Sequence, residues 1–411
     1  MTTDIYRLIV FFSILILIQG GIDYYLYKSI QRYEKIYGSS ITSFLIAYKY
    51  LSYLLLVLLV ITSIERLILG SNTNSGRIPQ ILIALWYLPK YPIALFLSII
   101  DLFRFFRVLM RRLPNHKEKY TEYQIDYGKR KTLHSIGLGI ASIPFLATAK
   151  GVLHTIYDVE IRRIELIIPR LSPVFDGFQI TQISDIHTGS LFGTSYIEHI
   201  IQTIEQESPD MITITGDYVN FNPTEFEPYV PFFTRLTAKH GVFGSLGNHD
   251  HYMNEENHEY LQSLIRKAGI ELLINDARTL ELHGAYLSIA GTDNTGFNQH
   301  YGDLLKACKN IPKGSPTILM AHDPTYWNLE IRDSSLIDLT LSGHTHGGQI
   351  GFEYLGSAFS PAQFVYEHWD GLYEGNGNYL YVNRGLGTVG PPIRIGIRPE
   401  ITCFTLRSLI A

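Results

Sequence analysis

The stretch Leu339-Thr-Leu-Ser-Gly-His-Thr-His-Gly-Gly348 decides the fold of the C-terminal part of the chain. A short run rich in apolar and β-branched residues ends at Gly343, which predicts a strand that leaves its sheet there. His344 and His346 are separated by one residue, so an extended segment directs both imidazoles to the same side. Two imidazoles directly after a strand predict a ligand site at the edge of a β-sheet.

Four other segments have the same construction, a strand-like run that ends in polar side chains able to bind a ligand. They are 178–187 (FQITQISDIH), 211–217 (MITITGD), 242–250 (VFGSLGNHD) and 317–323 (TILMAHD). Segments with helical character, such as Tyr196–Ser208 and Glu256–Ala268, lie between some of them. Alternating strands and helices predict parallel strands, and ligands gather beyond the carboxyl ends of such strands.

Together these segments supply carboxylate, amide and imidazole donors and no sulfur. The seven candidate ligands are Asp185, His187, Asp217, Asn248, His322, His344 and His346. Seven ligands are too many for one tetrahedral zinc ion. They predict two adjacent divalent ions of the Mn, Fe or Zn type, with a carboxylate such as Asp217 bridging them. Two such ions can clamp a phosphate and activate a water molecule.

The series DIH, GD, GNHD, AHD and GHTHGG resembles the calcineurin-like metallophosphoesterase family over about residues 160–411. The ending with Asn383-Arg-Gly-Leu-Gly387 and Pro391-Pro-Ile-Arg394 is similar to the bacterial membrane-linked branch of that family. The resemblance implies an α/β fold in which two mixed β-sheets pack as a sandwich flanked by helices. It also implies a metal-dependent hydrolase of phosphoric esters.

The resemblance further implies a role for each motif residue. It assigns the first metal to Asp185, His187 and His346, and the second metal to Asn248, His322 and His344. It assigns the carboxylate that bridges the two metals to Asp217. His249 matches the residue that hydrogen-bonds the phosphate and protonates the leaving oxygen. Asp250 is expected to orient His249. Asn220 stands where relatives often have Asp, with little expected consequence, and His251 has no implied role.

The first 153 residues contain four apolar stretches, at about 5–26, 44–64, 78–100 and 133–153. Each approaches the roughly 20 residues that a helix needs to cross a bilayer. We therefore predict an N-terminal bundle of about four transmembrane helices at 1–153 and a catalytic domain at 155–411. Pro89 and Pro92 interrupt the third stretch, so a kinked span and a re-entrant pair of short helices both stay open. Lys49 and Lys90 are expected to extend toward the membrane surface.

Loop charges predict the orientation of these spans. The loop between the third and fourth stretches carries nine basic residues, namely Arg104, Arg107, Arg111, Arg112, Lys117, Lys119, Lys129, Arg130 and Lys131. Such a loop stays in the cytoplasm, so the fourth span directs the catalytic domain to the extracytoplasmic side of the cell membrane. Residues 129–149 also have the pattern of an export signal. Two alternatives therefore stay open, a permanent fourth span and cleavage of the chain near 147–149.

The composition narrows the classes of partner. A net charge of −4 gives no support for nucleic-acid binding. The two cysteines, Cys308 and Cys403, cannot form a thiolate metal site, and both one disulfide and two free thiols stay open. The sequence determines neither the metal identities nor the oligomeric state.

The leading hypothesis is a membrane-anchored phosphoesterase that acts on a phosphomonoester or phosphodiester of a lipid or cell-envelope molecule. A domain tethered to a bilayer meets lipid head groups at a high effective concentration. One alternative is a pyrophosphatase acting on a UDP-diacylglucosamine-type lipid precursor, which requires a cytoplasmic active site. Another is a non-catalytic metal-binding membrane protein, but none of the motif residues is missing. A third is a channel or transporter regulated by the domain, for which we identify only Lys49 and Lys90 as intramembrane charges.

Overall fold

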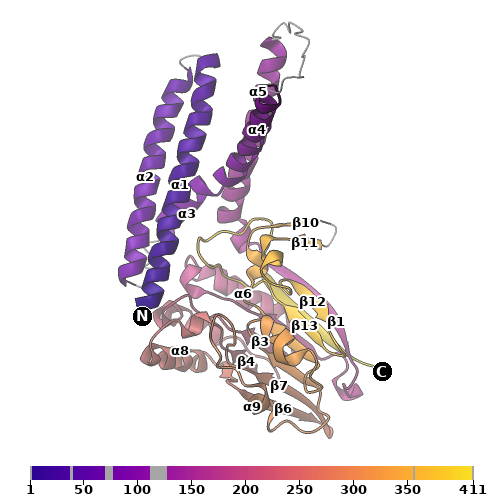
Figure 1. Cartoon of the computed structure of the whole chain (residues 1–411). Coiled ribbons are helices and arrows are strands. Elements are labelled where there is room, and N and C mark those ends of the chain that lie inside the picture. Colours follow the sequence, from indigo (N-terminus) through magenta and orange to yellow (C-terminus); the bar gives the residue numbers. More distant parts are fainter. Residues whose placement is uncertain (1, 38–39, 70–76, 112–126, 355–356, 410–411) are drawn as a thin grey trace. The chain divides into compact units, whose positions relative to one another are not determined.

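The computed structural model describes residues 2–37, 40–69, 77–111, 127–354 and 357–409 (Figure 1). The chain divides into two compact units, Met1–Val152 and Leu153–Ala411. In the described parts of the chain, the first unit is helical and the β-strands all belong to the second.

The described part of the first unit forms five helices, three of which contain segments suited to a membrane. The helices are α1 (Thr2–Tyr37), α2 (Ser40–Leu69), α3 (Arg77–Tyr87), α4 (Lys90–Arg111) and α5 (Tyr127–Leu153). Among the described residues, Ile9–Arg32, Ile41–Glu65 and Gly139–Tyr157 are long and apolar enough to cross a bilayer. These segments correspond to the first, second and fourth predicted stretches. Large apolar side chains are exposed along them, which suits a helix surface that contacts acyl chains.

The third predicted stretch forms two helices. α3 ends at Tyr87, the chain turns at Leu88 and Pro89, and α4 begins at Lys90. Proline lacks an N–H and disfavours a helical conformation of the residue before it, which explains the break. A pair of helices therefore takes the place of a single kinked one.

The expectation that Lys90 extends to the membrane surface is wrong. Its side chain is 2% exposed, and its Nζ lies 2.5 Å from Oδ1 of Asp23 on α1. The hydroxyls of Tyr48 and Ser52 on α2 donate to the same oxygen, both at 3.0 Å. A buried ion pair with further hydrogen bonds is less costly in apolar surroundings than a lone charge. Asp23 lies within the first predicted stretch, so Lys49 and Lys90 are not the only charged residues of the apolar stretches. Lys49, in contrast to Lys90, is exposed.

Part of the basic loop that predicts the orientation, including Arg112, Lys117 and Lys119, lies outside the described residues. Arg104 and Arg107 are exposed on α4. The side of the membrane on which the catalytic unit lies therefore stays a prediction.

The second unit contains two six-stranded mixed β-sheets, which confirms the predicted fold. The first sheet consists, in spatial order, of β1 (Glu160–Ile168), β14 (Glu400–Ser408), β2 (Gln179–Ile183), β3 (Met211–Thr215), β4 (Val242–Ser245) and β5 (Glu271–Leu272). The second consists of β12 (Gly371–Glu374), β13 (Tyr379–Val382), β9 (Leu339–Ser342), β8 (Thr317–Met320), β7 (Ala285–Gly291) and β6 (Asp276–Leu282). A separate hairpin pairs β10 (Phe352–Tyr354) with β11 (Ser357–Phe359).

Parallel pairing brings the predicted motifs to common edges. β2, β3 and β4 are parallel neighbours in the first sheet, and β8 and β9 are parallel neighbours in the second. Antiparallel pairs, such as β14 with β2 and β6 with β7, make both sheets mixed. Each of the five motifs directly follows one of these five parallel strands.

Three apolar cores hold the layers together. One lies between the sheets and includes Ile180, Met211 and Phe404 of the first sheet and Ile318 and Leu341 of the second. A second core packs the other face of the first sheet against α6 (Ser195–Glu207), α7 (Val230–Phe233) and α8 (Glu255–Lys267). A third packs the second sheet against a cover that includes α9 (Leu304–Cys308). Strands covered on both faces are almost continuously apolar, which explains runs such as that of β3.

Candidate metal centre

The predicted ligands meet where β2, β3 and β4 of one sheet and β8 and β9 of the other end. All of them are buried, with exposed fractions between 0 and 9%: Asp185, His187, Asp217, Asn248, His322, His344 and His346. The described residues contain three overlapping groups of Asp and His whose donor atoms lie within 4.8 Å of one another. Two of them are described below as the first and second donor groups, and the third joins His187 and Asp217 to His249. Each group has the composition of a metal-binding site.

The first donor group consists of Asp185, His187 and His346. Nε2 of His346 lies 3.1 Å from Nε2 of His187 and 3.3 Å from Oδ1 of Asp185. The loop after β9 thus brings His346 to the two residues that follow β2 in the other sheet. This group is the one that the resemblance assigned to the first metal.

The second donor group consists of Asp217, His322 and His344, and Asn248 adds an amide oxygen to it. Nε2 of His322 lies 3.1 Å from Oδ2 of Asp217 and 3.3 Å from Nδ1 of His344. The same Nδ1 of His344 lies 2.9 Å from Oδ1 of Asn248. The resemblance assigned Asn248, His322 and His344 to the second metal. These three residues therefore lie next to one another and to Asp217, the predicted shared ligand.

Asp217 connects the two groups through one oxygen atom. Its Oδ2 lies 3.4 Å from Nε2 of His187 in the first group and 3.1 Å from Nε2 of His322 in the second. The remaining oxygen, Oδ1, accepts the main-chain N–H of His249 at 2.8 Å. The carboxylate is thus held in an orientation that suits a bridging ligand.

The spacing and the charge of these donors fit divalent ions. Two nitrogen ligands about 2.1 Å from one ion are roughly 3.0–3.4 Å apart at octahedral or tetrahedral angles. Asp185 and Asp217 are buried, and within the described part of the chain their ion-pair partners are imidazoles, with no Lys or Arg. Buried carboxylates are normally paired with a full charge or coordinate a metal. The site therefore fits metal ions with nitrogen and oxygen ligands.

The imidazoles differ in how readily they lose a proton for a metal. Burial lowers the pKa of His346 well below its usual value, which favours the neutral form of the ring that can bind a metal. Burial, the largest single influence, acts to lower the pKa of His322. The charges of Asp217 and Asp185 and the hydrogen bonds to Asp217 and Thr215 together outweigh burial and raise that pKa to about 10. A metal ion therefore has to displace a proton from His322, as is general for metal binding by imidazoles.

Five of the candidate ligands have left-handed backbone conformations. The φ angles are 48° at Asp185, 45° at His187, 55° at Asp217, 73° at His344 and 52° at His346. For residues other than glycine this conformation costs on the order of 1–3 kcal/mol, and it persists where the surrounding fold imposes it. Strain concentrated at these positions indicates that the fold is organised around the site.

Two glycines are required by the close approach of these loops. A Cβ atom at Gly343 would lie 2.1 Å from Oδ2 of Asp185, and one at Gly247 would lie 2.2 Å from Oδ1 of Asp217. Contacts under 3.0 Å do not occur without movement of one partner. Glycine at these two positions therefore leaves room for the carboxylates.

His249 lies beside both donor groups, but Asp250 does not hold its ring. Nδ1 of His249 lies 2.8 Å from the carbonyl oxygen of Asn220 and donates to it. Burial lowers the pKa of His249 to about 4, although the charge of Asp217 opposes this shift. The ring that the family resemblance linked to Asp250 is instead oriented by the backbone carbonyl of Asn220.

Asp250 has a different set of partners, all of them backbone amides. Its carboxylate accepts the N–H groups of Asp217, Tyr218 and Gly247, each at 2.9 Å. It therefore joins the loop after β3 to the loop after β4 and supports the main chain at Asp217. The carboxylate of Asp250 therefore does not make the predicted orienting contact with the ring of His249.

Sequence reasoning missed two residues close to the donors. The hydroxyl of Tyr366 lies 3.2 Å from Nε2 of His344. Arg394 is fully buried, donates to the carbonyls of Arg384 and Gly387 at 2.9 and 2.7 Å, and lies 3.4 Å from Nδ1 of His346. Arg394 belongs to the C-terminal motif Pro391-Pro-Ile-Arg394, and that motif could have indicated its place near the site. No sequence pattern indicated Tyr366.

Two family profiles match the chain. The profile described as Calcineurin-like phosphoesterase matches residues 178–348, and the profile described as Probable Calcineurin-like phosphoesterase, transmembrane domain, matches residues 6–155. The first covers the five motifs up to Gly348, and the second covers the helical unit.

Relatives from several bacteria are similar to the chain. The Uncharacterized metallophosphoesterase YkuE of Bacillus subtilis is 34% identical over 240 residues, which are 57% of this chain and 80% of that protein. The Uncharacterized metallophosphoesterase Cj0846 of Campylobacter jejuni is 27% identical over 97% of this chain and 98% of its own length. Phosphodiesterase YaeI of Escherichia coli is 28% identical over 65% of this chain and 96% of its own length.

The sheet sandwich, the buried Asp and His groups and these similarities agree with one another. The apolar helices and the second profile make the chain membrane-associated. The chain belongs to the calcineurin-like phosphoesterase family and is a membrane-associated, metal-dependent phosphoester hydrolase.

Proposed function

We propose that two divalent ions of the Mn, Fe or Zn type bind at this centre and that the substrate is a lipid or cell-envelope phosphomonoester or phosphodiester. The observation that carries the two-ion part is the position of Oδ2 of Asp217, between His187 and His322. One carboxylate oxygen shared by two ligand sets offsets the repulsion between two adjacent cations. Metal pairs of this kind are typical of phosphate-ester hydrolysis.

Each ion would have its own ligands beside the shared Asp217: Asp185, His187 and His346 for one, and Asn248, His322 and His344 for the other. The bound ions would supply Lewis-acid stabilisation of phosphate charge and a lowered pKa of water. The chain itself supplies rigid placement. The main-chain N–H of His344 donates to both carboxylate oxygens of Asp185, at 2.9 and 3.0 Å, which links a ligand of one set to a ligand of the other.

We assign His249 to the substrate. A carbonyl oxygen only accepts, so Nδ1 carries the proton that is donated to Asn220, and Nε2 is left for a bound phosphate. The rings of Phe221 and Tyr252 pack against the imidazole, with centroids 5.7 and 4.8 Å away. A ring fixed in this way donates a proton to the leaving oxygen when Nε2 is protonated, as general acids do.

A lipid or envelope substrate is favoured by the covalent tether. The apolar segment Gly139–Tyr157 ends three positions before β1 starts at Glu160. Three extended residues span at most about 10 Å. The catalytic unit is therefore held close to head groups, which raises their effective concentration. The name of the relative YaeI, a phosphodiesterase, favours a phosphodiester over a monoester.

We also propose that the catalytic unit lies outside the cytoplasm, because the basic loop before α5 disfavours translocation. This position is the argument against the UDP-diacylglucosamine-type pyrophosphatase, whose substrate is cytoplasmic.

The test uses the full-length chain, purified in detergent, stripped of metal and reloaded with Mn²⁺, Fe²⁺ or Zn²⁺ in turn. The substrates are an aryl phosphodiester, an aryl phosphomonoester, lipid phosphates and a UDP-diacylglucosamine. We expect Mn²⁺ to support hydrolysis of the aryl diester and of a lipid phosphate. Full activity in excess chelator after dialysis would exclude the metal mechanism, and turnover confined to the UDP-linked lipid would favour the pyrophosphatase.

A matched pair of variants separates the site from general damage. Asp217→Asn is expected to reduce activity to background. Asp293→Asn is the control, because Asp293 is also a buried carboxylate paired with an imidazole, 2.7 Å from His251, but belongs to none of the donor groups.

A further inference from the structure

The β10–β11 hairpin exposes its aromatic side chains. Phe352 of β10 is paired with Phe359 of β11, so both lie on one face, and Tyr354 lies on that face two residues further along. Phe352, Phe359 and Tyr354 are 58, 41 and 70% exposed. Water-soluble hairpins place apolar side chains toward the domain and polar ones outward. This hairpin has the opposite arrangement.

The charged residue of β10 confirms which face is turned to the domain. Glu353 alternates with the aromatic residues, so it lies on the other face of the hairpin. Its carboxylate is 3.6 Å from the guanidinium of Arg162 and 3.4 Å from that of Arg384. Since these ion pairs hold the polar face against the domain, the aromatic face is left to the surroundings.

The exposed apolar surface continues beyond the hairpin into η10 (Pro361–Phe364). Phe364 and Val365 are 79 and 75% exposed. The ring of Phe359 is 5.1 Å from that of Phe352 and 6.3 Å from that of Phe364, between centroids, so the three rings form one row. We call the surface formed by Phe352, Tyr354, Phe359, Phe364 and Val365 the apolar strip. Contiguous exposed apolar surface of this kind marks interaction sites with proteins or membranes.

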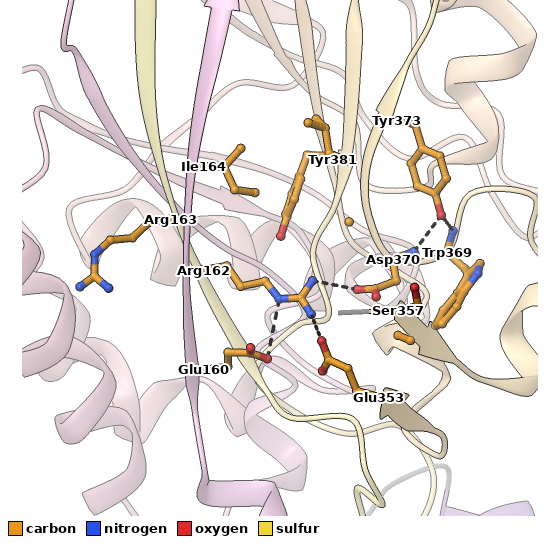
Figure 2. Close-up of a pocket in the computed structure, with 13 residues that line it drawn as sticks. Glu160, Arg162, Arg163, Ile164, Glu353, Ser357, Trp369, Asp370, Tyr373 and Tyr381 are labelled. Atoms are coloured by element: carbon orange, nitrogen blue, oxygen red, sulfur yellow. Dashed lines mark hydrogen bonds and ion pairs between the residues drawn. The ribbon is translucent and has the colours of Figure 1, made fainter. Parts of the chain in front are cut away.

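The apolar strip lies beside the point where the chain leaves its last apolar span. That span ends at Tyr157, and Glu160 begins β1. Figure 2 shows Arg162 joined to Glu160 of β1 and to Glu353 of β10, on the wall of a cavity of about 680 Å³. Arg384 makes the same connection, at 3.3 Å from Glu160 and 3.4 Å from Glu353. The hairpin is therefore tied to a residue only three positions from the span.

The other end of the apolar strip leads to the metal centre. Tyr366 directly follows Val365, and its hydroxyl lies 3.2 Å from Nε2 of His344. The side-chain hydroxyl of Thr345 donates to the carbonyl of Trp369 at 2.7 Å. The segment that carries the strip is thus bonded to the loop that holds two of the candidate ligands.

We infer that the apolar strip docks on the surface of the lipid bilayer that the chain spans. Phenylalanine and tyrosine are favoured at the boundary between head groups and acyl chains, where an exposed aromatic surface loses contact with water. None of the five side chains of the apolar strip is charged. The strip stays close to the span because ion pairs connect the hairpin to Glu160, three residues after the end of the span. Docking directs one end of the metal centre toward the membrane surface. Delivery of a lipid phosphate along the strip rests on the proposed function; docking itself does not.

The test of docking is a fluorescence measurement on the full-length chain in phosphatidylcholine vesicles. Both cysteines are free, so Cys308→Ser and Cys403→Ser remove them, and Phe364→Cys then carries an environment-sensitive label. We expect brominated lipid to quench this label at least twofold and aqueous acrylamide to have little effect. A label on Leu329→Cys is the matched control, because Leu329 is 74% exposed outside the strip, and it should respond only to acrylamide.

Two outcomes would overturn docking. Equal quenching of both labels by acrylamide means that the apolar strip faces water. Protection of the label at position 364 from both quenchers means that protein covers the strip, and cross-linking between labelled chains then distinguishes a second copy from another partner.

The test of delivery compares two substrates with the variant Phe364→Ser/Val365→Ser. We expect kcat/KM for a phosphate ester carried in vesicles to fall at least about tenfold, which corresponds to about 1.4 kcal/mol. The value for a water-soluble aryl phosphodiester should not change. The control Leu305→Ser/Leu329→Ser removes apolar side chains of similar exposure, 75 and 74%, and should alter neither value. Equal losses on both substrates would overturn delivery. If the unaltered chain ignores all vesicle substrates, the proposed substrate fails while the quenching result still decides docking.

Discussion

The ammonium of Lys90 lies 2.5 Å from the carboxylate of Asp23, and three aromatic rings surround it. The centroids of Tyr48, Trp86 and Tyr87 are 4.7, 3.8 and 4.9 Å from Nζ. Asp23 lies within α1, whereas Lys90 is the first residue of α4, directly after the break between α3 and α4. The pair therefore links the interrupted helices to the long ones through charge and cation–π contacts.

We expect removal of either partner to destabilise the helical unit. Asp23→Asn or Lys90→Met alone leaves one buried charge without its counterpart, a loss of about 3–5 kcal/mol. The double variant should recover part of this loss, because neither charge then remains. Thermal unfolding in detergent measures the coupling, with Lys49→Met, which removes an exposed lysine, as the control. Independent, additive losses would show that the two charges do not depend on each other.

The metal content of two variants should distinguish the role of Asp217 from the role of His249. Asp217 is shared by both donor groups, so Asp217→Asn should weaken binding of both ions. His249→Ala should leave metal content near normal and lower kcat by about 10²–10⁴, the usual cost of losing a general acid. Elemental analysis and steady-state kinetics of the same preparations provide the measurement. A His249→Ala protein without metal beside a fully loaded Asp217→Asn protein would reverse the two roles.

The partners of Asp250 predict a structural effect. Asp250→Ala leaves the buried N–H groups of Asp217, Tyr218 and Gly247 without an acceptor, at about 1–3 kcal/mol each. We therefore expect a large drop in Tm of the metal-free protein, and a smaller drop for Asp250→Asn, which keeps one acceptor oxygen. His249→Ala is the control, with a smaller change in Tm. Unchanged Tm with lost activity would instead return Asp250 to the role of orienting His249.

Gly343→Ala should disturb the first donor group. The added Cβ would lie 2.0 Å from Oγ of Ser184 and 2.1 Å from Oδ2 of Asp185, so the carboxylate has to move. We expect weaker metal binding and a loss of activity of at least tenfold, measured by metal titration and turnover. Gly139→Ala, where no atom lies within 4 Å of the new Cβ, is the control. Normal metal affinity in Gly343→Ala would mean that the loop accommodates the methyl group.

The proposed orientation predicts which reporter works at the C-terminus. The nine basic residues between Arg104 and Lys131 should stay in the cytoplasm, so a fusion after Ala411 lies outside it. Alkaline phosphatase fused there should be active, and a fluorescent protein that folds only in the cytoplasm should be dark. Strong fluorescence without phosphatase activity would place the domain in the cytoplasm and support the pyrophosphatase alternative.

Much of the site could be predicted from the sequence because its pattern is local. Each candidate ligand follows an apolar, β-branched run within a few residues, and β-propensity and turn chemistry act over that range. The predicted run Met211–Thr215 has the same bounds as β3, and the predicted run Leu339–Ser342 has the same bounds as β9. The apolar spans could be predicted for a similar reason, since their length and hydropathy are properties of continuous segments.

Contacts between distant segments could only be decided by the tertiary structure. His187 and His346 are 159 positions apart, and their separation of 3.1 Å depends on how two sheets pack. The acceptor of His249 is a backbone carbonyl, which no residue type in the sequence specifies. Asp23 and Lys90 are each costly alone in an apolar helix, and only their pairing across α1 and α4 makes both stable. The sequence by itself determined which side chains are candidate ligands, which segments are apolar enough to span a membrane and which have residue types that favour turns, because these properties depend on neighbours along the chain. The tertiary structure alone decided which of them meet, because that depends on packing across the whole fold.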